Sequence, residues 1–176
     1  MGPRDGLQNI KNEIPINKKI DLIDILSTTG IKKIECGSFV SAKWVPQMKG
    51  TDKIFQEISR KDGVKYTALT PNLKGFENAV DAQVDEIAVF AAASETFSQK
   101  NVNCSIEESL ERFQDIFKQA SEKKMPVRGY VSCIVECPYE GKVSPEKVLK
   151  VTTRLLDMGC YEVSLGDTIG KGTPKT

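Results

Sequence analysis

Residues 2–8, with the sequence GPRDGLQ, bring a guanidinium, a carboxylate and an amide together between glycines. The carboxylate of Asp5 can give a hard cation an oxygen ligand. The guanidinium of Arg4 can hold a carboxylate or a developing enolate with paired N–H donors. An Arg–Asp pair in a surface turn explains the same residues equally well, so the segment alone leaves both interpretations open.

Further polar residues stand where apolar runs of the sequence end. The runs at 31–37, 64–69, 86–92, 127–134 and 161–165 are expected strands, and segments with helical spacing separate most of them. The residues at their carboxyl ends are Glu35, Ser38, Thr70 to Asn72, Ser94, Glu95, Ser132, Asp167 and Thr168. The alternation predicts an α/β fold with a parallel sheet, because parallel strands need crossover connections. Both a doubly wound sheet and a TIM (β/α)₈-type barrel fit, and the polar residues favour the barrel, which gathers its chemistry at that face.

Three helices have clear limits in the sequence. Residues 17–29 carry an apolar stripe and end before Gly30, a residue suited to the left-handed position after a helix. Ser105 stands three residues before Glu108 and predicts a capping box at the start of an amphipathic helix. Residues 144–158 open on Ser-Pro and stop at Gly159, which is typical of a third helix.

Composition and charge bound the class of protein. The 176 residues are 39% hydrophobic and 28% charged, as in one globular domain that spans residues 1–176. The net charge of +1 comes from intermixed basic and acidic residues, which argues against nucleic acid and favours a small-molecule partner. No apolar run approaches the roughly 20 residues of a membrane span, and the first residues do not resemble a signal peptide. We therefore expect a soluble protein with no membrane partner.

The five cysteines are odd in number and scattered, which argues against a secreted disulfide framework. Cys133 and Cys137 are separated by three residues, without a second pair or any histidine, so a structural zinc site is disfavoured. The expected state is a set of small buried thiols in a reducing compartment.

Seven segments, in one order along the chain, resemble the hydroxymethylglutaryl-CoA lyase family. They are GPRDGLQN (2–9), SFVSAKWVPQM (38–48), TPNLKGFENAV (70–80), FAAASETFSQKNVNCSIEESLERF (90–113), RGYVSC (128–133), CPYEG (137–141) and GCYEVSLGDTIGKGTP (159–174). The R-D-G-x-Q element is shared with isopropylmalate and homocitrate synthases. The segment around Trp44 and the KNVNCSIEES segment resemble the lyase specifically; Trp44 itself is expected to pack and fix its loop.

The resemblance implies cleavage of 3-hydroxy-3-methylglutaryl-CoA to acetyl-CoA and acetoacetate, a step of leucine degradation and ketone-body formation. It implies a divalent metal, Mg²⁺ or Mn²⁺, which acidifies the tertiary hydroxyl. It also implies an acyl-CoA substrate, a homodimer and the mitochondrial matrix, with a cytoplasmic or peroxisomal location as the alternative.

By match to the family motif, Asp5 is the metal ligand, Arg4 stabilises the enolate and contacts the substrate, and Glu35 positions Arg4. Asp167 matches the acid beside the metal site, and Thr168 and Gln8 match substrate contacts. An N-cap on a following helix is the alternative for Asp167. Lys11 and Asn101 match positions at the acyl-CoA entrance, with solvated loop residues as the alternative.

The family also has an H-x-H pair of metal ligands and a glycine-rich loop with an Asn ligand and a catalytic Cys, and this sequence, which has no histidine, contains neither. We therefore expect a chain truncated at both ends, with about six of eight β/α units and no activity by itself. Glu136 and Lys171 depart from the motifs by placing charge near the expected catalytic face. The alternatives are a non-catalytic, lyase-like scaffold or acyl-CoA-binding relative, and a condensing synthase of the isopropylmalate or homocitrate type.

Overall fold

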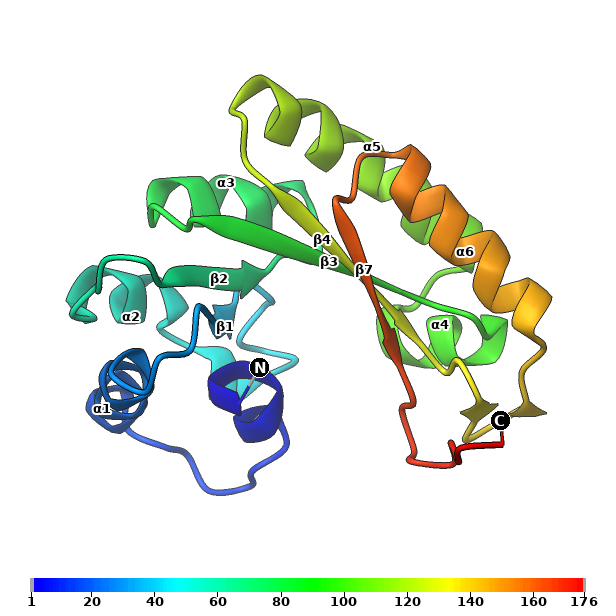
Figure 1. Ribbon diagram of the computed structural model, residues 1–176, viewed down its shortest axis with the longest axis horizontal. Coiled ribbons are helices and arrows are strands. Elements are labelled where there is room, and N and C mark those ends of the chain that lie inside the picture. The colour runs from blue at the N-terminus through cyan, green and yellow to red at the C-terminus, as the bar shows by residue number, and fades with distance from the viewer. Residues whose placement is uncertain (1, 176) are drawn as a thin grey trace. The chain divides into compact units, whose positions relative to one another are not determined.

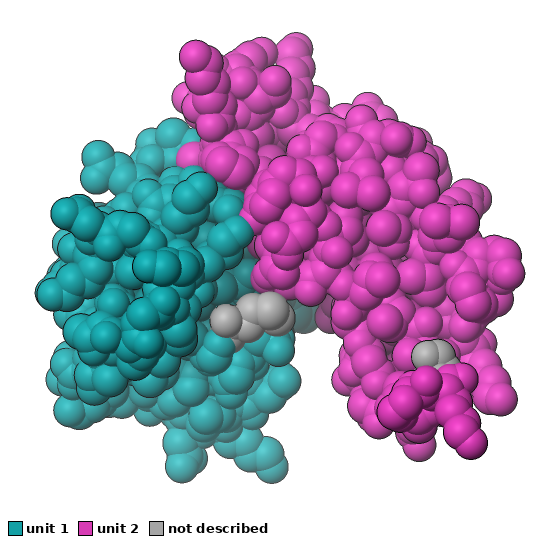
Figure 2. Space-filling view, viewed as in Figure 1, with its two compact units in different colours: residues 1–87 teal, residues 88–176 magenta. Residues whose placement is uncertain are grey.

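A computed structural model describes residues 2–175, which fall into two compact units divided after residue 87 (Figure 2). Five strands hydrogen-bond in the order β1-β2-β3-β4-β7, and β5 and β6 form a separate hairpin (Figure 1). Strands β1 and β2 pair in parallel, as do β4 and β7, which the alternation of strands and helices predicts. The chain therefore has the α/β class expected from its sequence.

The first unit begins with a π-helical turn, η1 (Gly2–Gly6), and α1 (Ile16–Ser27). It continues through β1 (Lys33–Ser38), a 3₁₀ turn η2 (Pro46–Met48), α2 (Thr51–Glu57), β2 (Lys65–Leu69) and α3 (Leu73–Asp81), and it ends within β3 (Glu86–Ala92). Helix α1 packs against α2 and β1. The core is built from Ile23, Ile34, Phe55, Tyr66 and Phe76, each at most 3% exposed.

The second unit contains the rest of β3, then α4 (Glu95–Val102), α5 (Ile106–Glu122), β4 (Val127–Ser132) and the hairpin β5 (Glu136–Cys137) and β6 (Gly141–Lys142). Helix α6 (Pro145–Asp157) leads into β7 (Glu162–Gly166) and packs on β4 and β7. Strand β4 alternates between buried and half-buried residues, so Gly129 and Val131 face the core on its helix-covered side. Glycine fits closely there, because a Cβ at residue 129 would stand 3.1 Å from the Cys160 sulfur and would require its neighbours to shift.

The local signals of the sequence mark the helix starts. Helix α5 has both hydrogen bonds of the capping box: Glu108 N–H donates to Ser105 Oγ at 3.1 Å, and Ser105 N–H donates to Glu108 Oε2 at 2.7 Å. Ser144 precedes α6 with Pro145 at its first position, but it makes no side-chain cap bond. The expected strands and helices agree with the structure to within about two residues at their ends.

Three details differ from the expectations. The described residues hold five strands of the main sheet, where about six β/α units were expected. The strand expected at 127–134 is two residues shorter and ends at Ser132, because Cys133 has a left-handed backbone with φ +61°. Trp44 was expected to pack, which is wrong: it is 77% exposed, with Lys43 Nζ 5.7 Å from its ring centroid.

Candidate active site

The centre of the first unit's polar site is the guanidinium of Arg4, which is 7% exposed. Its Nε donates to Oε1 of Glu35, and its Nη1 donates to Oδ1 of Asp5 at 3.0 Å. Glu35 is 3% exposed, whereas the Asp5 side chain is 58% exposed. The arginine is thus fixed by a buried carboxylate from β1 and bridged to a carboxylate that faces solvent.

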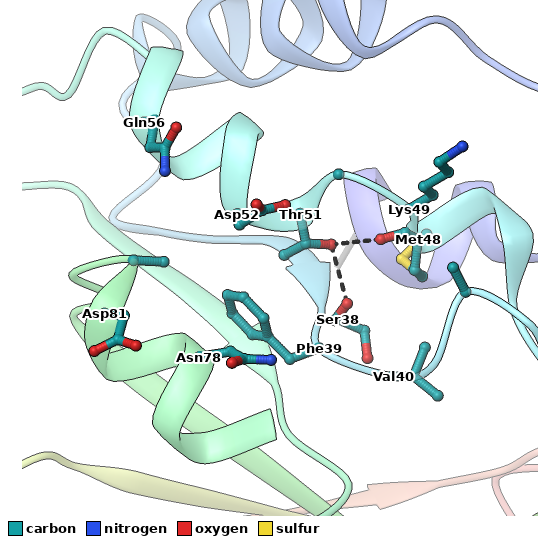
Figure 3. A pocket seen from close by; sticks show the side chains of 13 residues that line it. Ser38, Phe39, Val40, Met48, Lys49, Thr51, Asp52, Gln56, Asn78 and Asp81 are labelled. Atoms are coloured by element: carbon teal, nitrogen blue, oxygen red, sulfur yellow. Dashed lines mark hydrogen bonds between the residues drawn. The ribbon is translucent and has the colours of Figure 1, made fainter. Parts of the chain in front are cut away.

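The local geometry of β1 positions Glu35. The register between β1 and β2 shifts between Glu35 and Gly37, so one extra residue is accommodated there as in a β-bulge. Beyond the bulge, Thr51 lies so close to Gly37 that a Cβ on residue 37 would stand 2.7 Å from Thr51 Oγ1. The Thr51 hydroxyl has one proton to share between the carbonyl oxygens of Ser38 (3.0 Å) and Met48 (2.8 Å), as Figure 3 shows. Glycine at 37 therefore lets α2 close against the end of the strand that carries Glu35.

The loop after η1 holds two further residues expected to contact substrate. Gln8 is half-buried and Lys11 is exposed. The buried amide of Gln47 fixes this loop, because its Nε2 donates to the carbonyls of Ile10 (3.1 Å) and Asn12 (3.0 Å). Sequence reasoning did not single out Gln47, since only the fold brings it to a segment 35 residues away.

In the second unit, Asp167 and Thr168 follow directly after β7. The carboxylate of Asp167 accepts the N–H of Lys171 at 3.0 Å and of Gly172 at 2.6 Å. Residues 168–170, which follow Asp167 directly, form a turn and not a helix, so Asp167 closes a turn and is not an N-cap. Thr168 Oγ1 accepts the N–H of Cys133 at 2.7 Å, which ties the end of β7 to the end of β4.

Asn101 lies exposed on α4, and two carboxylates accept backbone N–H groups at the starts of α4 and α5. Glu140 accepts the N–H of Thr96 at 2.6 Å, and this hydrogen bond lowers the pKa of the Glu140 carboxyl. Glu95 accepts the N–H of Ile106 at 3.0 Å and so joins α4 to the first turn of α5. Sequence reasoning missed Glu140, whose only signal is its place in the CPYEG segment.

The two groups of expected site residues belong to different units, with Arg4, Asp5 and Glu35 in the first and Asp167 and Thr168 in the second. Their meeting at one face stays a prediction. Within residues 2–175, no three His, Cys, Asp or Glu side chains cluster as metal ligands. The carboxylate of Asp5 is an oxygen ligand of the kind Mg²⁺ and Mn²⁺ prefer, but one carboxylate does not make a complete site.

A cavity of about 460 Å³ lies in the first unit between the end of β1, α2 and α3 (Figure 3). Phe39, Asp52, Gln56, Asn78 and Asp81 are among the residues that line it. Neither Arg4, Asp5 nor Glu35 lines this cavity, so it is distinct from the Arg4 cluster.

The sequence profile of the HMGL-like family matches residues 1–176. The chain belongs to the HMGL-like family. Hydroxymethylglutaryl-CoA lyase, mitochondrial, of Bos taurus is 58% identical over 174 residues, which are 99% of this chain and 54% of that protein. The cytoplasmic 3-hydroxy-3-methylglutaryl-CoA lyase of Mus musculus is also 58% identical, over 99% of this chain and 51% of its own length.

Solved structures of HMGL-like relatives agree with the fold. Hydroxymethylglutaryl-CoA lyase from Pseudomonas aeruginosa is 58% identical, with a TM-score of 0.95 over 98% of this chain and 57% of its own. An HMG-CoA lyase from Acinetobacter baumannii, in complex with coenzyme A and 3-methylmalate, is 37% identical, with a TM-score of 0.95 over 99% of this chain and 57% of its own. The described residues therefore form part of a TIM-type barrel. The chain spans about half the length of the curated relatives it matches.

None of the helices within residues 2–175 is long and apolar enough to cross a bilayer.

Proposed function

We propose that this HMGL-like chain supplies the enolate-stabilising half of a hydroxymethylglutaryl-CoA lyase. The reaction would cleave 3-hydroxy-3-methylglutaryl-CoA: the tertiary hydroxyl loses a proton, the adjacent carbon–carbon bond breaks, and acetoacetate leaves the enolate of acetyl-CoA. The single observation that carries this proposal is the buried guanidinium of Arg4, clamped between Glu35 and Asp5.

Arg4 suits this role because its charge is fixed before the reaction begins. A thioester enolate concentrates negative charge on one oxygen, and a preorganised cation in a site shielded from water lowers the barrier to its formation. Glu35 balances the buried charge and orients the guanidinium plane from β1. Arg4 thereby serves as the catalytic residue, and Glu35 acts through it as a positioning residue.

The other residues have roles that follow from their surroundings. Asp5 is proposed as one carboxylate ligand of Mg²⁺ or Mn²⁺, which would supply Lewis-acid polarisation of the substrate hydroxyl. Asp167 is proposed as the acid beside that site, with its carboxylate held in a turn by two backbone N–H groups. Gln8, Lys11, Asn101 and Thr168 are proposed substrate contacts, and coenzyme A in the structure of a 37%-identical relative supports an acyl-CoA substrate.

The decisive experiment uses a completed barrel, in which the missing strands of a lyase relative are joined to this chain. Acetoacetate release from 3-hydroxy-3-methylglutaryl-CoA is measured with added Mg²⁺. Arg4→Gln should lower kcat by about 10²–10³ or more with little change in KM, because the interaction is made mainly in the transition state. An increase in KM at unchanged kcat would show that Arg4 is a substrate anchor and would remove its enolate role.

Asp5→Asn provides a contrasting variant in the same barrel. It should weaken metal affinity, so that excess Mn²⁺ partly restores the rate, whereas Arg4→Gln should not respond to metal. The polypeptide of residues 1–176 tested by itself should release no measurable acetoacetate, because one carboxylate cannot complete an octahedral site. Turnover of acetyl-CoA with a 2-oxo acid in place of cleavage would instead assign the completed barrel to the condensing synthases.

Relatives of this chain are named for both mitochondrial and cytoplasmic lyases. We propose the mitochondrial matrix for the protein, and organelle fractionation with an antibody to the chain tests this assignment.

A further inference from the structure

All five cysteines lie within residues 2–175 as free thiols, and each is buried. Cys36, Cys104 and Cys160 are dispersed over β1, the start of α5 and the segment before β7. Cys133 and Cys137 differ, because each thiol is a hydrogen-bond partner of the other. Cys133 follows β4 directly and has a left-handed backbone. Neither cysteine is used by the proposed lyase mechanism.

The sulfur of Cys137 is surrounded by hydrogen-bond donors. Ser94 Oγ donates to it at 3.0 Å, and the backbone N–H of Tyr139 donates at 3.4 Å. The N–H of Glu140 and the thiol of Cys133 also interact with it. A sulfur that receives several donors is stabilised as the thiolate, which is the nucleophilic form of cysteine.

The electrostatic consequences separate Cys137 from the other cysteines. Burial acts to raise the pKa of Cys137, but the hydrogen bonds from Ser94 and from the backbone outweigh it, so its pKa lies below the ordinary value. Burial raises the pKa of Cys36 and of Cys160 to about 12. Burial also raises the pKa of Cys133, to about 11, which keeps that partner protonated. The pair thus joins a poised nucleophile to a protonated neighbour.

We propose that Cys133 and Cys137 form an oxidation-sensitive dithiol, in which Cys137 reacts first with a small hydroperoxide and Cys133 then closes a disulfide. The enclosing donor shell, and not the mere presence of cysteines, distinguishes this pair from the remaining thiols.

The chemistry balances with hydrogen peroxide as the named oxidant. The Cys137 sulfur attacks one peroxide oxygen, the O–O bond breaks, and the departing hydroxide takes up a proton to leave as water. The resulting sulfenic acid is attacked by the Cys133 sulfur, which forms the S–S bond, expels a second hydroxide and gives up its own proton to make a second water. Two thiols are oxidised by two electrons in total, and one peroxide is reduced to two waters.

The disulfide would act on residues that hold the proposed site. Ser94 both donates to Cys137 and accepts the N–H of Phe97 as the N-cap of α4, the helix that carries Asn101. The N–H of Cys133 is bound by Thr168, which follows Asp167 at the end of β7. Formation of the disulfide would therefore remove the thiol that is hydrogen-bonded to Ser94, the N-cap of α4. It would also strain the hydrogen bond between the Cys133 N–H and Thr168 after β7.

The test treats the purified chain with hydrogen peroxide, alkylates the remaining thiols and maps the peptides by mass spectrometry. The peptide segment that contains both Cys133 and Cys137 should lose the mass of two hydrogen atoms and escape alkylation before any other cysteine reacts. In Cys133→Ser the reaction should stop at a sulfenic acid on Cys137, trapped by dimedone. In Cys137→Ser the disulfide should be lost, and Cys160→Ser is the matched control that should retain it.

The Ser94→Ala variant tests how much the hydrogen bond from Ser94 contributes to the reactivity of Cys137. The Ser94 hydroxyl is a donor that lowers the Cys137 pKa, so its removal should lower the thiolate fraction and slow the oxidation of Cys137 relative to the wild type. Circular dichroism checks that α4 remains folded in this variant. Preferential oxidation of Cys36, Cys104 or Cys160, or a wild-type chain whose Cys133 and Cys137 stay alkylatable after the others are oxidised, would overturn the proposal. Because the readout is a mass shift, it is independent of whether the protein proves to be a lyase.

Discussion

Removing Glu35 tests whether the buried ion pair controls the stability of the first unit. Glu35 and Arg4 are 3% and 7% exposed, so Glu35→Met leaves a guanidinium that has already lost its water and now lacks its buried partner. Breaking a buried pair in this way typically costs about 3–5 kcal/mol. Because Asp5 still accepts from Arg4 at 3.0 Å, we expect the lower end, about 3 kcal/mol.

Thermal and urea unfolding followed by far-UV circular dichroism measure this loss. For a chain of this length, about 3 kcal/mol corresponds to a fall of roughly 6–12 °C in Tm. Glu57→Met is the matched control, because Glu57 pairs with Lys53 on the surface of α2 at 3.6 Å with half-exposed side chains. That pair should contribute only about 0.3–0.5 kcal/mol.

The double variant Arg4→Met/Glu35→Met separates an unpaired charge from lost packing. Replacing both members of a buried pair by apolar side chains of similar volume is often neutral or stabilising, so the double variant should recover most of the stability lost in Glu35→Met. If the double variant is as unstable as the single one, the cost comes from packing around β1, and the charge-balance role of Glu35 is wrong.

Three further changes have outcomes fixed by the structure. Ser105→Ala should lower the free energy of unfolding in urea by about 1 kcal/mol, because it removes a formed capping box. Ser144→Ala should be nearly neutral, because Ser144 makes no cap bond. Equal losses of stability in the two variants would contradict this prediction. Gly37→Ala should cost about 1–3 kcal/mol, since its Cβ would meet Thr51 at 2.7 Å, while Gly6→Ala meets nothing within 4 Å and serves as the control in the same assay. The raised pKa of Cys160, about 12 against a usual 9.0, means that the folded state holds this proton more tightly, so the stability it contributes is present below pH 9 and lost between pH 9 and 12. The fall in Tm from about pH 8 to pH 10.5 should accordingly be smaller in Cys160→Ala than in the wild type, and an unchanged slope would refute the assignment.

Features encoded by neighbouring residues could be predicted from the sequence. The capping box needs only Ser105 and Glu108, three positions apart on one turn, and both of its bonds are confirmed. The strand at 86–92 was predicted with its bounds, because β-branched and apolar residues run without interruption between polar flanks. Such signals depend on local backbone chemistry, so they can be recognised without knowledge of the fold.

Features that depend on distant contacts could not be predicted in the same way. The hydrogen bond between Ser94 and Cys137 joins residues 43 positions apart. The left-handed backbone at Cys133 could not be predicted either, because the residue there is not a glycine. The expectation that Trp44 packs failed because a large apolar residue type does not determine burial by itself. The pairing of Arg4 with Glu35, 31 positions away, was expected only from the family resemblance, and the hydrogen bond between them confirms the contact while their catalytic roles stay predictions.

Burial alone does not identify the proposed catalytic cluster, because the first unit holds a second ion pair with a buried carboxylate. Lys33 Nζ contacts both carboxylate oxygens of Glu86 at 2.9 Å, and Glu86 is 2% exposed. Lys33 and Glu86 are the first residues of β1 and β3, at the end of the strands opposite to the one where a barrel carries its chemistry. The Arg4 cluster differs in adding a carboxylate, Asp5, that remains 58% exposed beside the buried guanidinium. A fixed cation with an accessible carboxylate next to it has the groups that the proposed enolate and metal roles require, whereas the Lys33–Glu86 pair joins the starts of β1 and β3. That difference in accessibility, more than the presence of charge, is the physical reason to place the chemistry at Arg4.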